Sequence, residues 1–102
     1  MPLHKIEKLR DAIRKIHGCD AIWIATVPVR EEWKGKTAWE GVVQVFELTG
    51  HNRAKRCYVW NYEDGGRSYY TTVLELPPVT DAESAVKVAI AAKARNTTTK
   101  QL

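Results

Sequence analysis

Apolar residues near the N-terminus recur at intervals of three or four positions. The stretch PLHKIEKLRDAIRKIHG carries five of them on one stripe: Leu3, Ile6, Leu9, Ile13 and Ile16. This spacing predicts an amphipathic helix, with a proline in its first turn and a glycine at its C-terminal exit. Its opposite face carries mostly lysine and arginine, which is typical of a solvated helix face.

The middle of the chain is rich in β-branched and aromatic residues that show no helical period. Four strands are predicted, over residues 21–29, 37–48, 55–62 and 67–76. Their short glycine-containing connections favour antiparallel hairpins, and the last connection permits a two-residue turn at Asp64-Gly65 or at Gly65-Gly66. Pro28 indicates an edge position or a bulge in the first strand.

The sheet is predicted to end at Pro77-Pro78, because neither proline donates to a ladder. Thr80 and Glu83 have capping-box spacing, so an alanine-rich helix should follow, as far as about residue 95.

These elements define an α+β fold class in the order α-β-β-β-β-α. The sheet is predicted to be a four-stranded antiparallel meander with both helices packed mainly on one face. The chain of 102 residues is long enough to bury one core. We therefore expect a single domain over residues 1–95 and a disordered tail over residues 96–102.

Alternation of side chains in the last hairpin separates two faces, whichever turn is used. One face is aromatic and contains Tyr58, Trp60, Tyr62 and Tyr69. The other is more aliphatic and contains Cys57, Val59, Tyr70 and Leu74. The aliphatic face suits the alanine-rich helix better, so we expect the aromatic face to point away from the helices.

The first hairpin is also apolar on both faces. One face groups Trp23, Val27, Val42 and Phe46, and the other groups Ile22, Ile24, Val43 and Val45. Either the helices lie on opposite faces, or another molecule covers the aromatic side. We favour the second interpretation, with another copy of the chain as the simplest covering molecule, because most soluble oligomers are symmetric homo-oligomers.

The charge balance adds a second hypothesis. Sixteen Lys and Arg residues against twelve Asp and Glu give a formal charge of +4, a weak bias towards anionic partners. The basic stretch HNRAKR leads directly into the aromatic face. Arg53, Lys55 and Arg56 would contact phosphates, and neighbouring aromatic rings would stack on bases. A nucleic-acid-binding module is therefore the alternative to a protein-interaction module.

Residues suited to catalysis or metal binding are sparse. His17, Cys19, His51 and Cys57 contain the residue types of a zinc site, but their spacing does not match short chelating loops, so no metal is expected. They also supply the only thiol and histidine pairs for nucleophilic catalysis, without an informative motif. A small enzyme or ligand-binding protein is the weaker alternative, and no cofactor is expected.

The two cysteines are too few for a disulfide scaffold. No stretch has the apolar length of a signal peptide or a membrane span. We therefore expect a cytoplasmic protein with no membrane partner.

The segment GKTAWEGVVQVFELTGHNRAKRCYVW, residues 35–60, resembles a family of small, uncharacterised bacterial proteins, and the likeness continues through VLELPPVTDAESAVKVAI. This resemblance implies a bacterial cytoplasmic protein and supplies no activity. The element order is also similar to that of the double-stranded RNA-binding domain. The chain departs from that domain by its fourth strand and by acidic Asp81 and Glu83 where lysines would begin the last helix.

Taken together, these patterns predict a non-enzymatic interaction module that forms a homodimer or binds a protein partner through the aromatic face. The candidate contact residues, for protein or nucleic acid, are Arg53, Lys55, Arg56, Tyr58, Trp60, Tyr62 and Tyr69.

Overall fold

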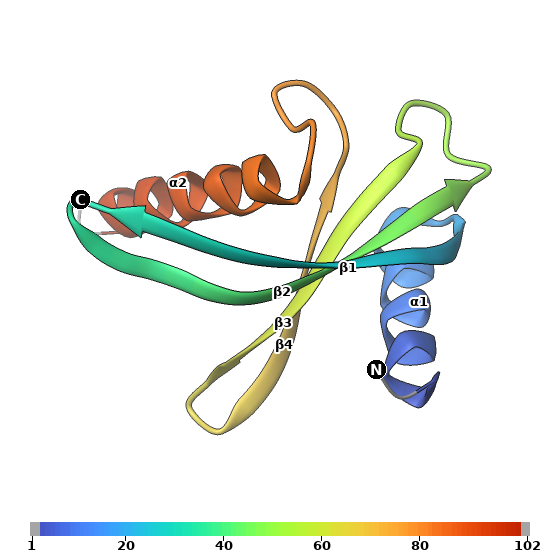
Figure 1. The fold of residues 1–102 in the computed structure, drawn as a ribbon, viewed down its shortest axis with the longest axis horizontal. Coiled ribbons are helices and arrows are strands. Elements are labelled where there is room, and N and C mark those ends of the chain that lie inside the picture. Colours follow the sequence, from blue (N-terminus) through green and yellow to red (C-terminus); the bar gives the residue numbers. More distant parts are fainter. Residues whose placement is uncertain (1–2, 101–102) are drawn as a thin grey trace.

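The computed structural model describes the backbone of residues 3–100 and the side chains of residues 5–92 except 33, 62–64 and 68. Six elements follow one another: α1 (Leu3–His17), β1 (Asp20–Trp33), β2 (Lys36–Thr49), β3 (Arg56–Asp64), β4 (Arg67–Leu74) and α2 (Ala82–Lys100). The α+β class and the antiparallel meander are confirmed (Figure 1). The last helix continues past residue 95, where its end was predicted, into the segment predicted to be a disordered tail.

Two tight turns close the hairpins. Lys34 and Gly35 both have positive φ angles, 54° and 77°, as a type I′ turn requires. Gly65 and Gly66 do the same at 60° and 81°. Of the two turns that the sequence permits in the last hairpin, the structure therefore uses Gly65-Gly66.

The strands lie in the order β1-β2-β3-β4, so β1 and β4 are the two edges. The sheet twists strongly, and the β3–β4 hairpin crosses the long β1–β2 hairpin at a steep angle (Figure 1). Two register shifts interrupt the first hairpin. Trp23 pairs with Phe46 and Ala25 pairs with Val45, which leaves Ile24 as an extra residue of β1. Near the turn, Glu31 pairs with Trp39 and Glu32 pairs with Thr37, which leaves Ala38 as an extra residue of β2. Grouping Val27 with Trp23 on one face was therefore wrong, because the extra residue reverses the alternation after residue 24.

The first core lies between α1 and one face of the sheet. Ile6, Leu9 and Ile13 of α1 are buried against residues that include Phe46, Cys57 and Val59, and we call this side of the sheet the α1 face. The predicted helical stripe ends early, because Ile16 is 57% exposed. His17 lies four residues after Ile13, takes the inward position, and places its Nε2 atom 2.8 Å from the Thr72 Oγ1 atom.

The second core lies under α2 on the opposite side, the α2 face. Ala82, Ala85 and Val86 pack in one cluster with sheet residues that include Val43, Val45, Tyr58 and Trp60. The cap of α2 lies one residue later than predicted: the backbone N–H of Ser84 donates to the Asp81 carboxylate at 2.8 Å.

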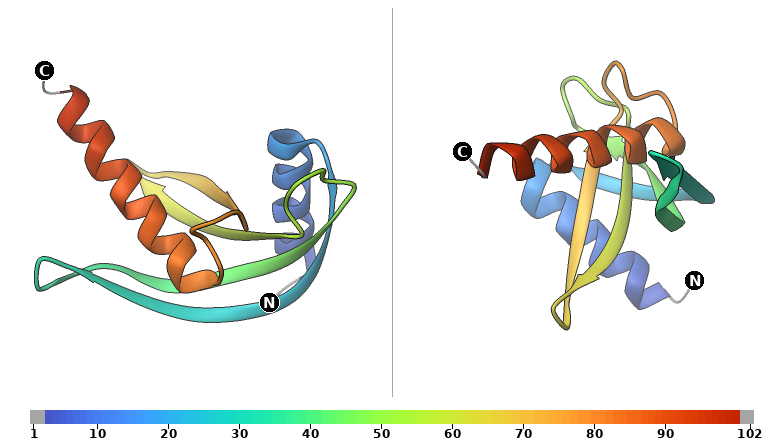
Figure 2. Two further views of the ribbon diagram at one scale, coloured as in Figure 1. Left: turned by 90° about the horizontal axis from the view of Figure 1, so that it is seen from above. Right: turned by 90° about the vertical axis from the view of Figure 1, so that its left-hand side faces the viewer.

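The two helices therefore lie on opposite faces of the sheet, and the prediction that both pack mainly on one face was wrong. Figure 2 shows α2 and α1 on either side of the β3–β4 hairpin. Successive strand residues point to opposite faces, so Cys57 and Val59 contact the α1 core while Tyr58 and Trp60 contact the α2 core. The small alanine side chains of α2 approach the large rings closely enough to bury them.

Candidate protein-interaction surface

The aromatic face predicted as the contact surface is covered by α2. Tyr58 is 2% exposed and Trp60 is 5% exposed. The Tyr58 hydroxyl donates to the Glu75 carboxylate and lies 3.4 Å from the Thr80 carbonyl oxygen. Burial and the neighbouring Glu75 carboxylate both raise the pKa of Tyr58. Tyr58 and Trp60 therefore serve the core in this structure.

The other predicted contact residues are divided between the loop and the far edge. Arg53, Lys55 and Arg56 are exposed in and directly after the β2–β3 loop. Tyr69 is 39% exposed on β4, and the side chain of Tyr62 lies outside the described residues. The three basic residues are therefore exposed as predicted, whereas Tyr58 and Trp60 are buried.

His51 organises the basic loop. Its Nδ1 atom accepts the backbone N–H of Arg53 at 3.1 Å and that of Ala54 at 2.9 Å. Its ring also meets the ring of His17 edge to face, with centroids 6.5 Å apart. The loop is therefore closed by a side-chain acceptor, and His51 and His17 both have local structural partners.

Large apolar side chains are exposed elsewhere, mainly on the sheet. In the described part of the chain they are Ile16, Ile22, Trp23, Ile24, Val42, Tyr69 and Tyr70. Three of them are consecutive residues of the edge strand β1, and they are 58%, 41% and 43% exposed in chain order. Because successive strand side chains point to opposite faces, both faces of the sheet are open at this point of the edge.

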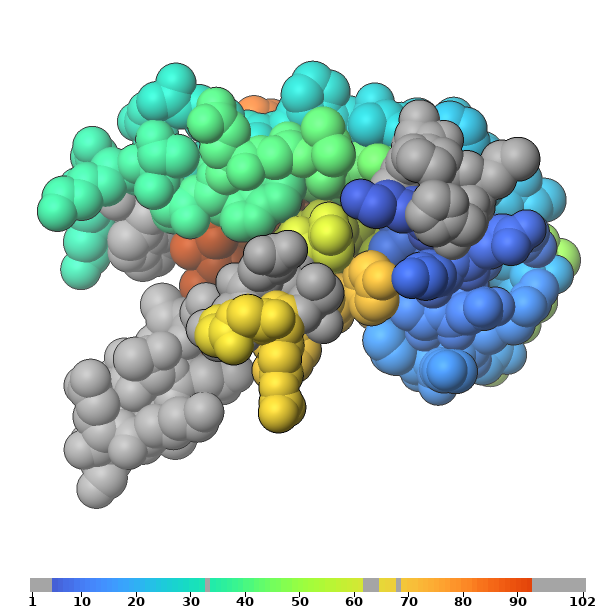
Figure 3. Space-filling view, turned by 90° about the horizontal axis from the view of Figure 1, so that it is seen from below, coloured from blue at the N-terminus to red at the C-terminus, as the bar shows by residue number. Residues whose placement is uncertain are grey.

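The positions of the helices explain this exposure. α1 covers its face around Ala21 and Phe46, whereas α2 covers its own face around Val29 and Val43. Each helix therefore covers only part of one face, and neither covers β1 between these two regions. In Figure 3, α1 (blue) lies over one end of the molecule while β2 (green) stays visible beside it.

Trp23 is exposed but firmly held. Its indole N–H donates to the Gln44 Oε1 atom at 2.8 Å, and the Thr26 hydroxyl donates to the same oxygen at 2.6 Å. Gln44 itself is buried, with 3% of its surface exposed. The indole is thus fixed before any partner arrives, which lowers the entropy lost when an aromatic side chain enters an interface.

An open groove of about 560 Å³ lies beside this part of β1, between the strand and the start of α2. Ile24, Val27 and Val45 contribute apolar walls, and Arg56 and Asp81 contribute charge. The lining residues include no histidine, cysteine or lysine. Its Asp81 carboxylate is already bound to the Ser84 N–H, which lowers the pKa of Asp81. The groove extends the apolar surface of β1, and the hydroxyl of its lining residue Tyr58 is bonded to Glu75.

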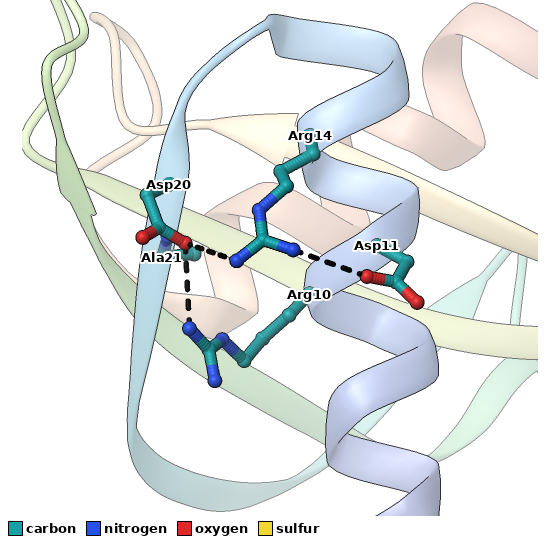
Figure 4. Close-up of polar contacts among 5 residues, drawn as sticks. All are labelled: Arg10, Asp11, Arg14, Asp20 and Ala21. Carbon is teal, nitrogen blue, oxygen red and sulfur yellow. Dashed lines mark hydrogen bonds and ion pairs between the residues drawn. The ribbon is translucent and has the colours of Figure 1, made fainter.

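An ion-pair cluster fixes the start of β1 to α1 (Figure 4). Asp20 accepts the backbone N–H of Ala21 at 2.9 Å and pairs with Arg14 at 3.1 Å and Arg10 at 3.4 Å. These bonds, that of the Ala21 backbone first, lower the pKa of Asp20. Arg14 also pairs with Asp11 at 3.3 Å, so the cluster joins four charged residues and orients α1 against the start of β1.

The thiols are buried in the α1 core. Burial raises the pKa of Cys57 to about 12 and also raises the pKa of Cys19, so neither thiol is activated as a nucleophile. Within residues 5–92, those whose side chains are described, no group of three or more His, Cys, Asp or Glu residues is placed to hold a metal ion. The histidine and cysteine set singled out in the sequence does not form such a site.

Sequence reasoning did not single out Ile22, Trp23, Ile24 and Gln44 as contact residues. One sequence feature did point to this strand: Pro28 indicated an edge position or a bulge. In the structure, β1 is an edge strand and also contains a bulge. An edge strand with consecutive large apolar residues on both sides of its pleat is the pattern to look for.

No protein-family model, no curated protein and no solved structure matches the chain. The resemblance to a family of small bacterial proteins stays a prediction. No helix among residues 3–100 is both long enough and apolar enough to cross a membrane.

Proposed function

We propose that the protein is a non-enzymatic interaction module that binds another protein chain along the edge strand β1. The supporting observation is the exposure of Ile22, Trp23 and Ile24, one after another, on an edge of the sheet. An added helix would cover only one face at this point. An added strand would cover both faces and would also pair with the free backbone groups of the edge.

The preorganised Trp23 supports a protein partner. Tryptophan is enriched among the residues that dominate protein–protein affinity, and such residues cluster near the centre of an interface. Trp23 has apolar neighbours on both sides along the strand and a fixed indole orientation. The cytoplasmic location and bacterial origin expected from the sequence remain part of this proposal. Two free buried cysteines are consistent with the cytoplasmic location.

Nucleic-acid binding is the less favoured function. It required aromatic rings beside the basic loop, and the rings of Tyr58 and Trp60 are buried under α2. Arg53, Lys55 and Arg56 without those rings are equally well explained as a solvated basic loop.

The proposal is tested by presenting extended chains to the protein. A phage-displayed library of random linear peptides is selected on the folded protein, and hydrogen exchange is measured with a selected peptide. We expect slowed exchange of backbone amides in β1 and apolar residues in the selected peptides. Protection located elsewhere, or no selected peptide at a protein concentration where the chain is monomeric, would contradict the proposal.

Two substitutions provide a matched comparison. Ile22 is 58% exposed on β1, and Ile16 is 57% exposed on α1. Ile22→Glu should abolish peptide binding because it places a charge on the contact strand, and Ile16→Glu should leave it unchanged. Exposed positions of this kind usually change stability by no more than about 0.5 kcal/mol, so both variants should fold.

A further inference from the structure

We infer that the natural occupant of the β1 edge is a second copy of this chain, paired antiparallel with its own β1 about a two-fold axis at Trp23. This inference rests on the proposed function and identifies the partner. It is carried by the sequence of the exposed segment, by the side chains that the pairing would bring together, and by the features that limit the length of the pairing.

The exposed residues Ile22, Trp23 and Ile24 form the centre of a palindrome. Residues 21–25 read Ala-Ile-Trp-Ile-Ala in both directions. In an antiparallel pair centred on Trp23, that residue lies opposite itself, and Ile22 lies opposite the partner subunit's Ile24. Each exposed side chain therefore lies opposite a side chain of the same residue type. A two-fold interface requires this kind of self-complementarity.

The pairing covers the exposed atoms on both faces of the sheet. Trp23 pairs across the ladder with Phe46, so it lies on the α1 face, where the two indoles would meet. Ile22 pairs with Glu47 and lies on the α2 face, where it would meet the partner subunit's Ile24. Aromatic pairs and aliphatic pairs across strands each contribute favourably to pairing.

The charges nearby permit this register. Asp20 would lie opposite the partner subunit's Thr26, so the charge of Asp20 does not face a like charge. Its carboxylate is already paired with Arg14 and Arg10 of its own chain. No charged residue lies between positions 21 and 29. Like charges directly opposite each other would destabilise a strand pair, and this register avoids them.

Two features restrict the pairing to a short segment. The bulge at Ile24 disturbs the regular ladder, and Pro28 has no N–H to donate. Bulges and prolines are both features that protect edge strands against continued pairing with further chains. Pro28 would end the pairing shortly after the palindrome, whereas the bulge at Ile24 lies within the palindrome and shortens the regular ladder there. Since each copy uses its only β1 edge, the assembly closes as a dimer.

Oligomeric state gives the first test. Sedimentation equilibrium of the full chain over a concentration series should show a monomer–dimer equilibrium. Ile22→Glu should raise the dissociation constant at least tenfold, the size of a change of about 1.4 kcal/mol. Ile16→Glu, with a matched exposure, should leave it unchanged. A dimer that persists in Ile22→Glu would overturn the inference, because the contact would then lie elsewhere.

Cross-linking tests the register. Ile22→Cys and Ile24→Cys variants are mixed in equal amounts and mildly oxidised. Directly opposite strand positions are close enough for a disulfide, whereas diagonal positions are less favourable. We therefore expect the mixed pair to cross-link faster than either variant alone, with no cross-link in Ile16→Cys. Equal cross-linking in all samples would contradict the register.

The two proposals fail in different ways. A chain that stays monomeric at every concentration but binds selected peptides along β1 would refute the second copy and leave the interaction module standing. A monomer that also selects no peptide would refute both. Circular dichroism and thermal unfolding of each variant separate loss of contact from loss of the fold.

Discussion

The Trp23 indole N–H donates to the Gln44 side chain at 2.8 Å and so ties an exposed residue of the edge strand to a buried residue of β2. The bond fixes the side chain that we place at the two-fold axis. Gln44 therefore influences the interface by holding Trp23 in position.

Gln44→Leu should weaken self-association with little effect on folding. Leucine has a similar volume but no acceptor, so Trp23 loses its fixed orientation. Trp23 and Thr26 are exposed, and their freed donors can bind water. We expect the dissociation constant to rise about tenfold, equivalent to about 1.4 kcal/mol. Thr26→Val also removes a bond to Gln44 but keeps the Trp23 bond, so it should weaken association less than Gln44→Leu. An equal loss in both variants would contradict the positioning role.

Tyr58→Phe should destabilise the fold and leave association unchanged. The hydroxyl of Tyr58 bonds to Glu75 beneath α2, and its removal forfeits one hydrogen bond to a charged group. We expect a loss of about 1.5–3 kcal/mol in the free energy of unfolding, measured by urea denaturation. Tyr70→Phe, at a 40% exposed position of β4, should cost less. A Tyr58→Phe protein as stable as the wild type would show that the bond adds nothing to stability.

The protein should lose stability below neutral pH through His17. Burial, and next the nearby His51, lower the pKa of His17 below 6.5 in the folded state. The unfolded state therefore binds more protons as the pH falls through 6.5, and the free energy of unfolding decreases in that window. Above it the contribution of His17 is constant.

His17→Gln isolates this effect, because glutamine can still bond to Thr72 but does not titrate. Urea denaturation of wild type and variant over the same pH series should show a smaller decrease in the variant. Parallel curves for the two proteins would exclude His17 as the source.

Both thiols should be unreactive in the folded protein. Cys57 has no exposed surface and a pKa raised to about 12, and Cys19 is 8% exposed. Labelling with a chromogenic disulfide reagent should be slow in buffer and should reach two thiols per chain in denaturant. Fast labelling of one thiol without denaturant would show that the α1 core opens locally, and Cys19→Ser would identify which thiol reacted.

The sequence was sufficient for the elements and for the strand order, because periodicity and turn chemistry are local properties. The alternation of side chains along a strand also predicted correctly that Tyr58 and Trp60 share one face of the sheet. It did not show which helix covers that face, since both faces are apolar and the choice depends on how α2 packs in three dimensions. The face that was expected to bind a partner is therefore a core.

The candidate surface depended on two features that are hard to read from one sequence. The bulge at Ile24 changes which residues share a face, and Pro28 alone did not locate it. The exposure of Trp23 depends on where each helix stops covering the sheet. By contrast, the exposure of Arg53, Lys55 and Arg56 agrees with what their composition predicted.

The bulge also determines which residues of β1 point into each of the two cores. The odd-numbered residues of a regular strand all point to the same side, yet Ala21 belongs to the core under α1, and Val29 belongs to the core under α2. Because Ile24 is an extra residue with no partner on β2, these two odd-numbered residues point to opposite sides of the sheet. Deleting Ile24 would join Trp23 directly to Ala25 opposite Phe46 and Val45, and every other side chain of β1 would keep its present side. A chain shorter by this one residue would therefore keep the side chains of both cores on their present faces of the sheet.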